Sequence, residues 1–160
     1  IGELIVRGAN VMRGYWGKPE ATAKAFHIDQ QTQERLLRTG DVFYEDADGD
    51  LFFVGRADDM FKCRGERVAP RLVEDALHAL PGVLQAAVIG VDDEADGKAV
   101  KAFVVPSPRA ELDVNALRKA CQRVLEPWLV PKFIEICAEL PQTDSGKVTR
   151  AKLREAERVH

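Results

Sequence analysis

The chain has 160 residues, with 23 lysines and arginines against 26 aspartates and glutamates, and its formal net charge is −3. This near balance gives no reason to expect nucleic acid or an anionic membrane surface as the main partner. No apolar run approaches the roughly 20 residues of a membrane span, so we expect no transmembrane segment, and the cysteine pattern predicts a cytoplasmic protein. The cysteines form no CxxC pair and have no nearby histidines, which predicts reduced thiols rather than disulfides or a metal site. They are Cys63, Cys121 and Cys137.

In chain order, the first part of the sequence predicts short strands, one helix and turns. Residues 3–7 form a strand pattern, and residues 19–26 predict a short helix because a proline occupies its first turn. A Thr-Gly pair predicts a turn just before Asp41. Residues 51–54 predict another strand, after an Asp-Gly-Asp turn. The pattern changes at residues 58–59, where we expect a domain boundary.

The second part of the sequence predicts a compact α+β domain. Residues 60–68 predict a short hairpin turned by Arg64 and Gly65. Asp113 is placed to cap a helix, and runs rich in valine and alanine predict sheet strands. The expected helices cover residues 70–80, 113–125 and 149–158, and the expected strands cover residues 83–91, 99–105 and 133–136. The predicted fold is thus a small three-stranded sheet with a hairpin and flanking helices, preceded by a β-rich tail.

Several short motifs occur in a fixed order along the chain. They are Gly-Glu-Leu-Ile-Val-Arg-Gly at residues 2–8 with Gly-Tyr-Trp at 14–16, Arg-Thr-Gly-Asp at 38–41, Gly-Arg-Ala-Asp-Asp at 55–59, Met-Phe-Lys-Cys-Arg-Gly-Glu-Arg-Val at 60–68 and Gln-Thr-Asp-Ser-Gly-Lys-Val-Thr-Arg at 142–150. Any one of them is weak by itself. In this order and at these spacings they resemble the C-terminal part of the adenylate-forming superfamily, which comprises acyl- and aryl-CoA ligases, nonribosomal peptide synthetase adenylation domains and beetle luciferases.

The resemblance implies a domain organisation. Residues 1–58 correspond to the C-terminal tail of a large N-terminal, nucleotide-binding domain, and residues 59–160 correspond to a mobile small C-terminal domain. Full enzymes of the superfamily are considerably longer, so we expect a fragment whose partner is the missing N-terminal portion of the same enzyme. Asp58 matches the hinge residue about which the small domain turns between two half-reactions, with Asp59 as a competing candidate.

Lys147 is the first candidate catalytic residue. Turn-forming residues surround it and Gly146 frees the neighbouring backbone, so its ammonium can be carried to an anionic centre and withdrawn. The resemblance implies that it stabilises the charge that develops at the α-phosphate of ATP when a carboxylate attacks. A solvated lysine on a surface turn is the alternative interpretation. By the same resemblance, Asp41 accepts hydrogen bonds from the ribose hydroxyls and Arg56 contacts the ribose.

The predicted hairpin carries the candidates for a second reaction step. Gly65 would let the backbone approach the pantetheine arm of CoA, and Lys62 aligns with a lysine that some members use in that step. Arg64 and Arg67 could contact CoA phosphates. An ordinary hairpin glycine and two surface arginines are the alternatives.

The function that the resemblance implies is an AMP-forming acid–CoA ligase. It would use ATP with Mg²⁺ to convert a carboxylic acid into acyl-AMP and pyrophosphate, and then form a thioester with CoA and release AMP. The segments at residues 67–74 and 145–150 are closer to CoA ligases than to peptide-synthetase domains. A peptide-synthetase adenylation domain and a catalytically inert fragment that lacks most of the substrate pocket are the alternatives.

Overall fold

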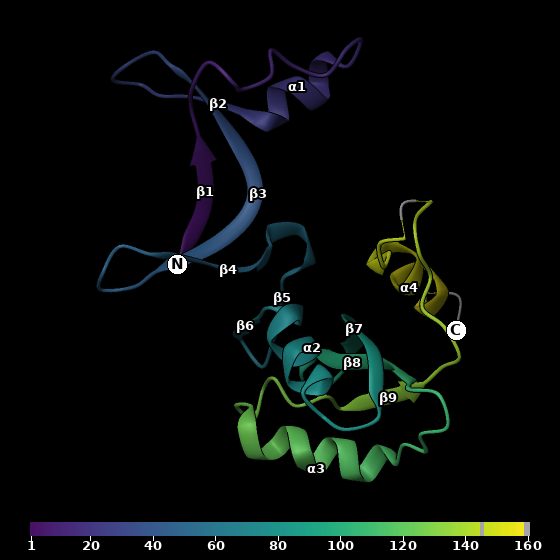
Figure 1. The fold of residues 1–160 in the computed structure, drawn as a ribbon. Helices are drawn as coiled ribbons and strands as arrows, with labels where there is room; N and C mark the ends of the chain where they lie inside the picture. Colours follow the sequence, from purple (N-terminus) through teal and green to yellow (C-terminus); the bar gives the residue numbers. More distant parts are fainter. Residues whose placement is uncertain (145, 159–160) are drawn as a thin grey trace. The chain divides into compact units, whose positions relative to one another are not determined.

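The computed structural model describes residues 1–144 and 146–158, which form two compact units (Figure 1). The first unit comprises residues 1–58 and the second residues 59–160. Within the described residues, no helix combines the length and the apolar character that crossing a membrane requires.

The first unit is an antiparallel sheet built around one long strand, β3 (Arg35–Glu45). Strand β1 (Gly2–Val6) pairs with one edge of β3, while β2 (Phe26–Ile28) and β4 (Leu51–Arg56) pair with successive parts of the other edge. Helix α1 (Pro19–Ala25) begins with the proline that the sequence indicated. The expected β-rich tail is therefore present, but its central strand β3 was not among the strands predicted from the sequence.

The prediction of a turn before Asp41 is wrong, because residues 39–41 lie inside β3. The sheet register shifts between Glu3 and Ile5 of β1, so β3 carries extra residues there and forms a bulge. Gly40 supplies the left-handed backbone, with φ of 73°, and its N–H donates to the Glu3 carboxylate over 3.0 Å. Because both edges of β3 are paired, the Thr-Gly step bends the strand instead of reversing it.

The second unit contains the predicted three-stranded sheet and hairpin. Strands β7 (Val83–Asp93) and β8 (Gly97–Pro106) are antiparallel, and β9 (Phe133–Ile136) pairs with β8 in parallel. Strands β5 (Phe61–Cys63) and β6 (Glu66–Val68) form the separate hairpin. Both β7 and β8 extend beyond the apolar runs that predicted them, because their polar ends still pair with each other across a short turn.

Three helices complete the second unit, namely α2 (Pro70–His78), α3 (Val114–Val124) and α4 (Arg150–Glu157). Asp113 caps α3 as predicted, since its carboxylate accepts hydrogen bonds from the backbone N–H groups of the second and third helical residues. The α2 helix ends two residues before the predicted position.

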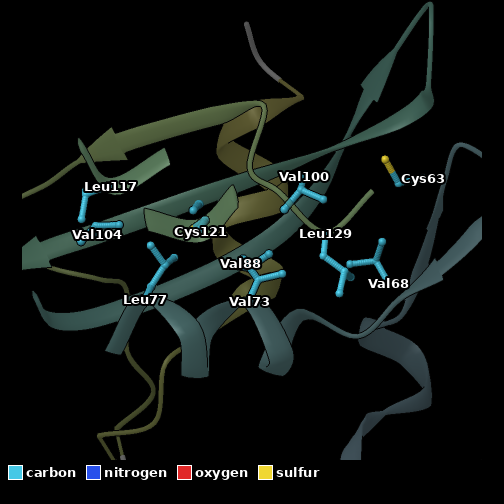
Figure 2. Packing of buried hydrophobic residues seen from close by; sticks show 12 residues of the cluster. Cys63, Val68, Val73, Leu77, Val88, Val100, Val104, Leu117, Cys121 and Leu129 are labelled. Atoms are coloured by element: carbon cyan, nitrogen blue, oxygen red, sulfur yellow. The ribbon is translucent and has the colours of Figure 1, made fainter. Parts of the chain in front are cut away.

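Both faces of the β7–β8–β9 sheet are buried, which explains why β7 and β8 are apolar without alternation in their middle parts. Figure 2 shows Val73 and Leu77 of α2 lying against Val88 of β7 and Val104 of β8. The neighbouring residues in each strand turn to the opposite face, where Leu153 of α4 packs. The first cluster contains Cys63, Val68, Val73, Leu77, Ala86, Val88, Val100, Ala102, Val104, Leu117, Cys121 and Leu129, and the second contains Ala87, Ile89, Phe103, Val105, Leu140 and Leu153.

Candidate functional site

Asp41 and Arg56, both predicted to contact the ribose, are direct neighbours across the β3–β4 pair. Arg56 Nη1 donates to Asp41 Oδ1 over 2.9 Å and to the Thr39 carbonyl over 3.0 Å. A Cβ atom on Gly40 would lie 2.9 Å from Arg56 Nη2, so the glycine leaves room for the guanidinium. The bulge in β3 thus places an oriented carboxylate beside an oriented guanidinium on an accessible edge of the first unit.

The two hinge candidates differ in how they are held. Both belong to the 3₁₀ turn η1 (Ala57–Asp59), at the boundary between the two units. Asp59 accepts a hydrogen bond from Arg150 over 3.0 Å and another from Arg154 over 2.6 Å, and both arginines lie in α4. Asp58 is exposed, and no partner holds its side chain within the described ranges. Its backbone can therefore rotate without breaking a side-chain hydrogen bond or ion pair of the described residues, whereas Asp59 is bound to α4 of the second unit.

The tip of the β5–β6 hairpin has a type I′ conformation, with φ of 54° at Arg64 and 85° at Gly65. Arg64 is held there by the β7–β8 turn, because its Nε donates to Asp96 Oδ1 over 2.9 Å and its backbone N–H donates to the Asp96 carbonyl over 3.1 Å. The hydrogen bond to Asp96 raises the pKa of the Arg64 guanidinium. A phosphate contact at Arg64, as predicted from the sequence, would have to compete with this ion pair.

Lys62 and Arg67 lie directly opposite each other in the same hairpin. Both are exposed, and in residues 1–144 and 146–158 neither has a carboxylate within ion-pair distance. Like charges in this arrangement destabilise a strand pair, so the hairpin presents two cations without compensation from the fold. Beside them, a Cβ atom on Gly65 would have nothing within 4 Å, which leaves the backbone at the tip open to a ligand.

Lys147 lies in a narrow loop whose two arms are paired. Gln142 and Val148 form an isolated antiparallel bridge, and the Thr143 N–H donates to the Lys147 carbonyl over 2.8 Å. Gly146, with φ of 78°, makes the turn, and its N–H donates to the Thr143 carbonyl over 2.8 Å. Ser145, the remaining member of the motif, lies outside the described residues. The Lys147 side chain is exposed and has no carboxylate partner in the described part of the chain.

A group of ion pairs at the start of α4 was not predicted from the sequence. Arg150 contacts Glu74 of α2 and Asp59, and Arg154 also contacts Asp59. Glu74 is buried, and its Oε1 accepts a hydrogen bond from the Val88 backbone N–H over 2.9 Å as well. One signal was present in the sequence: Glu74 falls on the apolar face of the predicted helix, where a charge requires a buried partner.

The cysteines do not qualify as nucleophiles. Burial raises the pKa of the Cys63, Cys121 and Cys137 thiols, so they remain protonated near neutral pH. Their burial fits structural packing rather than a reactive thiol.

Comparisons with known proteins agree with the family resemblance of the motifs and with the predicted fold class. Residues 72–147 match the model of the AMP-binding enzyme C-terminal domain. Sulfoacetate–CoA ligase of Cupriavidus necator is 44% identical over 153 residues, which cover 96% of this chain and 29% of that protein. Long-chain-fatty-acid–CoA ligase of Yersinia pestis is also 44% identical, over 158 residues that cover 98% of this chain and 26% of that protein.

The fold itself matches solved structures. The amide bond synthetase McbA from Marinactinospora thermotolerans superposes with a TM-score of 0.85 at 37% identity, over 97% of this chain and 31% of that one. The chain spans about three tenths of the length of these relatives. The chain belongs to the adenylate-forming enzymes and corresponds to their C-terminal part.

Proposed function

We propose that the chain is the C-terminal part of a longer ATP-dependent carboxylic acid–CoA ligase. Residues 1–58 would end its nucleotide-binding domain, and residues 59–160 would be a mobile small domain hinged at Asp58. In the first step, a carboxylate oxygen attacks the α-phosphorus of ATP, the bond to pyrophosphate breaks, and acyl-AMP forms. In the second step, the CoA sulfur attacks the acyl carbon, AMP leaves, and the thiol proton is released. We also propose that the reaction takes place in the cytoplasm and that ATP reacts as its Mg²⁺ complex.

The observation that carries the first step is the presentation of Lys147. Its ammonium is exposed and unpaired on a loop whose two arms are bridged, so it can enter an anionic centre without first breaking an ion pair of the described structure. Charge develops at the α-phosphorus during adenylation, and a preorganised cation stabilises it most in a water-poor site. Asp41 and Arg56 support the same step by offering a carboxylate and a guanidinium in one fixed geometry to the ribose.

The second step is supported by the hairpin. Lys62 and Arg67 are paired cations on this hairpin with no ion-pair partner among the described residues, and a Cβ atom on Gly65 would meet nothing within 4 Å beyond its chain neighbours. CoA carries phosphates that such cations attract and a pantetheine arm that needs close backbone approach. Within this proposal, Arg64 holds the tip in place through Asp96 while Arg67 and Lys62 meet the ligand.

The carboxylic acid itself is not specified by this part of the protein. Two relatives with equal identity to the chain are named for acids as different as sulfoacetate and a long-chain fatty acid. An amine acceptor has support of its own, because McbA is an amide bond synthetase. A peptide-synthetase adenylation domain would instead transfer the acyl group to a carrier-protein thiol.

The decisive experiment measures the two steps separately in the longer ligase that carries this chain. Pyrophosphate release is followed with a panel of carboxylic acids, and acyl transfer from preformed acyl-AMP is followed with CoA, a carrier protein or an amine. Lys147→Ala should slow adenylation about 100- to 1000-fold and leave acyl transfer to CoA nearly intact. Lys119→Ala, which removes an exposed lysine of α3, is the matched control and should change neither step.

Equal losses in both steps for Lys147→Ala would reject its assigned role. If the acyl group is transferred to a carrier protein or an amine but not to CoA, CoA is not the acceptor of the second step. The 160-residue chain should show no pyrophosphate release by itself, and activity of the isolated chain would contradict the proposed division of the site.

A further inference from the structure

The ion pairs around Arg150 connect three elements of the second unit. Arg150 is the first residue of α4, and its Nη2 donates to Glu74 Oε2 over 2.6 Å and to Oε1 over 2.8 Å. Its Nε donates to the same Oε1 over 3.1 Å, and its Nη1 donates to Asp59 Oδ2 over 3.0 Å. One guanidinium therefore bridges α2, α4 and the residue that follows the proposed hinge.

This arrangement is built for a guanidinium. Burial disfavours the charge of Arg150, but hydrogen bonds to Glu74 and the nearby carboxylates raise its pKa, so it stays ionised. Glu74 is buried and needs a cation, and its Oε1 also accepts a hydrogen bond from the Val88 N–H. A lysine at position 150 would supply one ammonium in place of a planar fork, and it could not reach both carboxylates with the same geometry.

The bridge is directly attached to the Lys147 loop. Two residues separate Lys147 from Arg150, and the second of them, Thr149, is the N-cap residue of α4. Thr149 makes no side-chain cap, and its buried Oγ1 has no partner in the described residues. The start of α4 is therefore held by the Arg150 side chain, together with the Thr149 N–H that donates to the Pro141 carbonyl over 2.8 Å.

We propose that Arg150 is a positioning residue that fixes the base of the Lys147 loop to Glu74 and Asp59, so that Lys147 and the segment after the hinge move as one body. This inference rests on the adenylation role proposed for Lys147. Arg150 does not touch the reacting atoms. It determines where the ammonium arrives when the small domain turns about Asp58, because its bridge ends at the adjacent Asp59.

The test compares Arg150→Lys with Arg154→Lys, Lys147→Ala and the double variant Lys147→Ala/Arg150→Lys in the longer ligase. Arg150→Lys should lower kcat for adenylation about 10- to 100-fold, because a displacement near 1 Å has an effect of that order, and should leave acyl transfer and the KM for ATP nearly unchanged. Arg154 contacts Asp59 but not Glu74, so Arg154→Lys should have a much smaller effect. In the Lys147→Ala background, Arg150→Lys should cause no further loss.

Hydrogen exchange of the 160-residue chain supplies a readout that does not depend on activity. Arg150→Lys should speed exchange of the Thr143 and Thr149 amides, which close the loop, and leave the α3 amides unchanged. Unchanged loop exchange, or adenylation losses that add in the double variant, would overturn the positioning role. If Lys147→Ala alone left adenylation intact, the proposed function would fail, while the exchange result would still decide whether Arg150 holds the loop.

Discussion

Arg56 and Asp41 lie opposite each other on β4 and β3, and Arg56 Nη1 donates to Asp41 Oδ1 over 2.9 Å. Both side chains are partly exposed, so this ion pair contributes little to stability. Its main effect is to orient the carboxylate, since the Arg56 guanidinium is also fixed by the Thr39 carbonyl. An ion pair that adds little stability but holds the carboxylate in one orientation fits the proposed ribose-binding role.

Asp41→Ala should weaken ATP binding by the longer ligase, because ribose hydrogen bonds to a charged acceptor are each worth about 1.5 to 3 kcal/mol. Calorimetry of ATP binding measures the loss directly. Glu34→Ala is the matched control, since Glu34 forms an exposed ion pair with Arg7 in the same unit. Unchanged ATP affinity in Asp41→Ala would leave Asp41 with only its structural role in the bulge.

Gly65 has two possible roles that substitution can separate. Gly65→Asn should preserve the hairpin, because asparagine tolerates the left-handed backbone of this position, whereas Gly65→Ala should strain it. If pantetheine passes over the tip, both variants slow acyl transfer, and Gly65→Asn does so without a matching loss of thermal stability. A Gly65→Asn variant with normal acyl transfer would show that only the turn needs the glycine.

Arg67→Gln should affect stability and CoA binding in opposite directions. Relief of the repulsion with Lys62 should raise the unfolding free energy of the chain by about 0.2 to 1 kcal/mol. The KM for CoA in the longer ligase should rise, and its dependence on salt should weaken, because a phosphate contact is lost. Lys119→Gln removes the same charge from α3 and should leave the KM unchanged. An unaltered KM in Arg67→Gln would contradict the proposed CoA contact.

The hinge proposal predicts different outcomes at adjacent residues. Asp58→Pro fixes φ near −65°, which should trap one orientation of the small domain. We expect adenylation to survive and acyl transfer to fail, since the resemblance places the larger dihedral change before the second step. Asp59→Asn should instead lower stability by about 2 kcal/mol, because it weakens hydrogen bonds to Arg150 and Arg154. Separate assays of the two steps decide it: normal acyl transfer in Asp58→Pro would place the pivot elsewhere.

Gly90→Ala tests how the hairpin is attached to the sheet. A Cβ atom at Gly90 would lie 2.6 Å from the ring of Phe61, so the variant should destabilise the second unit by about 1 to 3 kcal/mol. Denaturant unfolding followed through Trp128 measures the change. Phe61→Leu should reduce the penalty of Gly90→Ala in a double-mutant cycle. Gly2→Ala, where an added Cβ meets nothing within 4 Å, is the control; an equally small effect at Gly90 would show that the hairpin shifts freely.

Much of the second unit could be predicted from the sequence because its signals are local. Asp113 caps α3 through N–H groups two and three residues away, and the Arg64–Gly65 pair makes the hairpin turn at its own position. The valine-rich runs predicted β7 and β8 because strands buried on both faces leave no alternation. The motifs around Lys147 and Asp41 indicated the family for the same reason.

Only the tertiary structure decided which residues distant in the sequence contact these locally determined turns, strands and helices. Residues 39–41 form a bulge instead of a turn because both edges of β3 are paired. Glu74 and Arg150 are 76 positions apart in the chain, and Arg64 and Asp96 are 32 apart. A charged residue in a sequence shows that a partner is needed, but the partner is selected by how the elements pack. The sequence by itself therefore determined the family and the candidate groups, while packing determined which of the described cations form ion pairs and which do not.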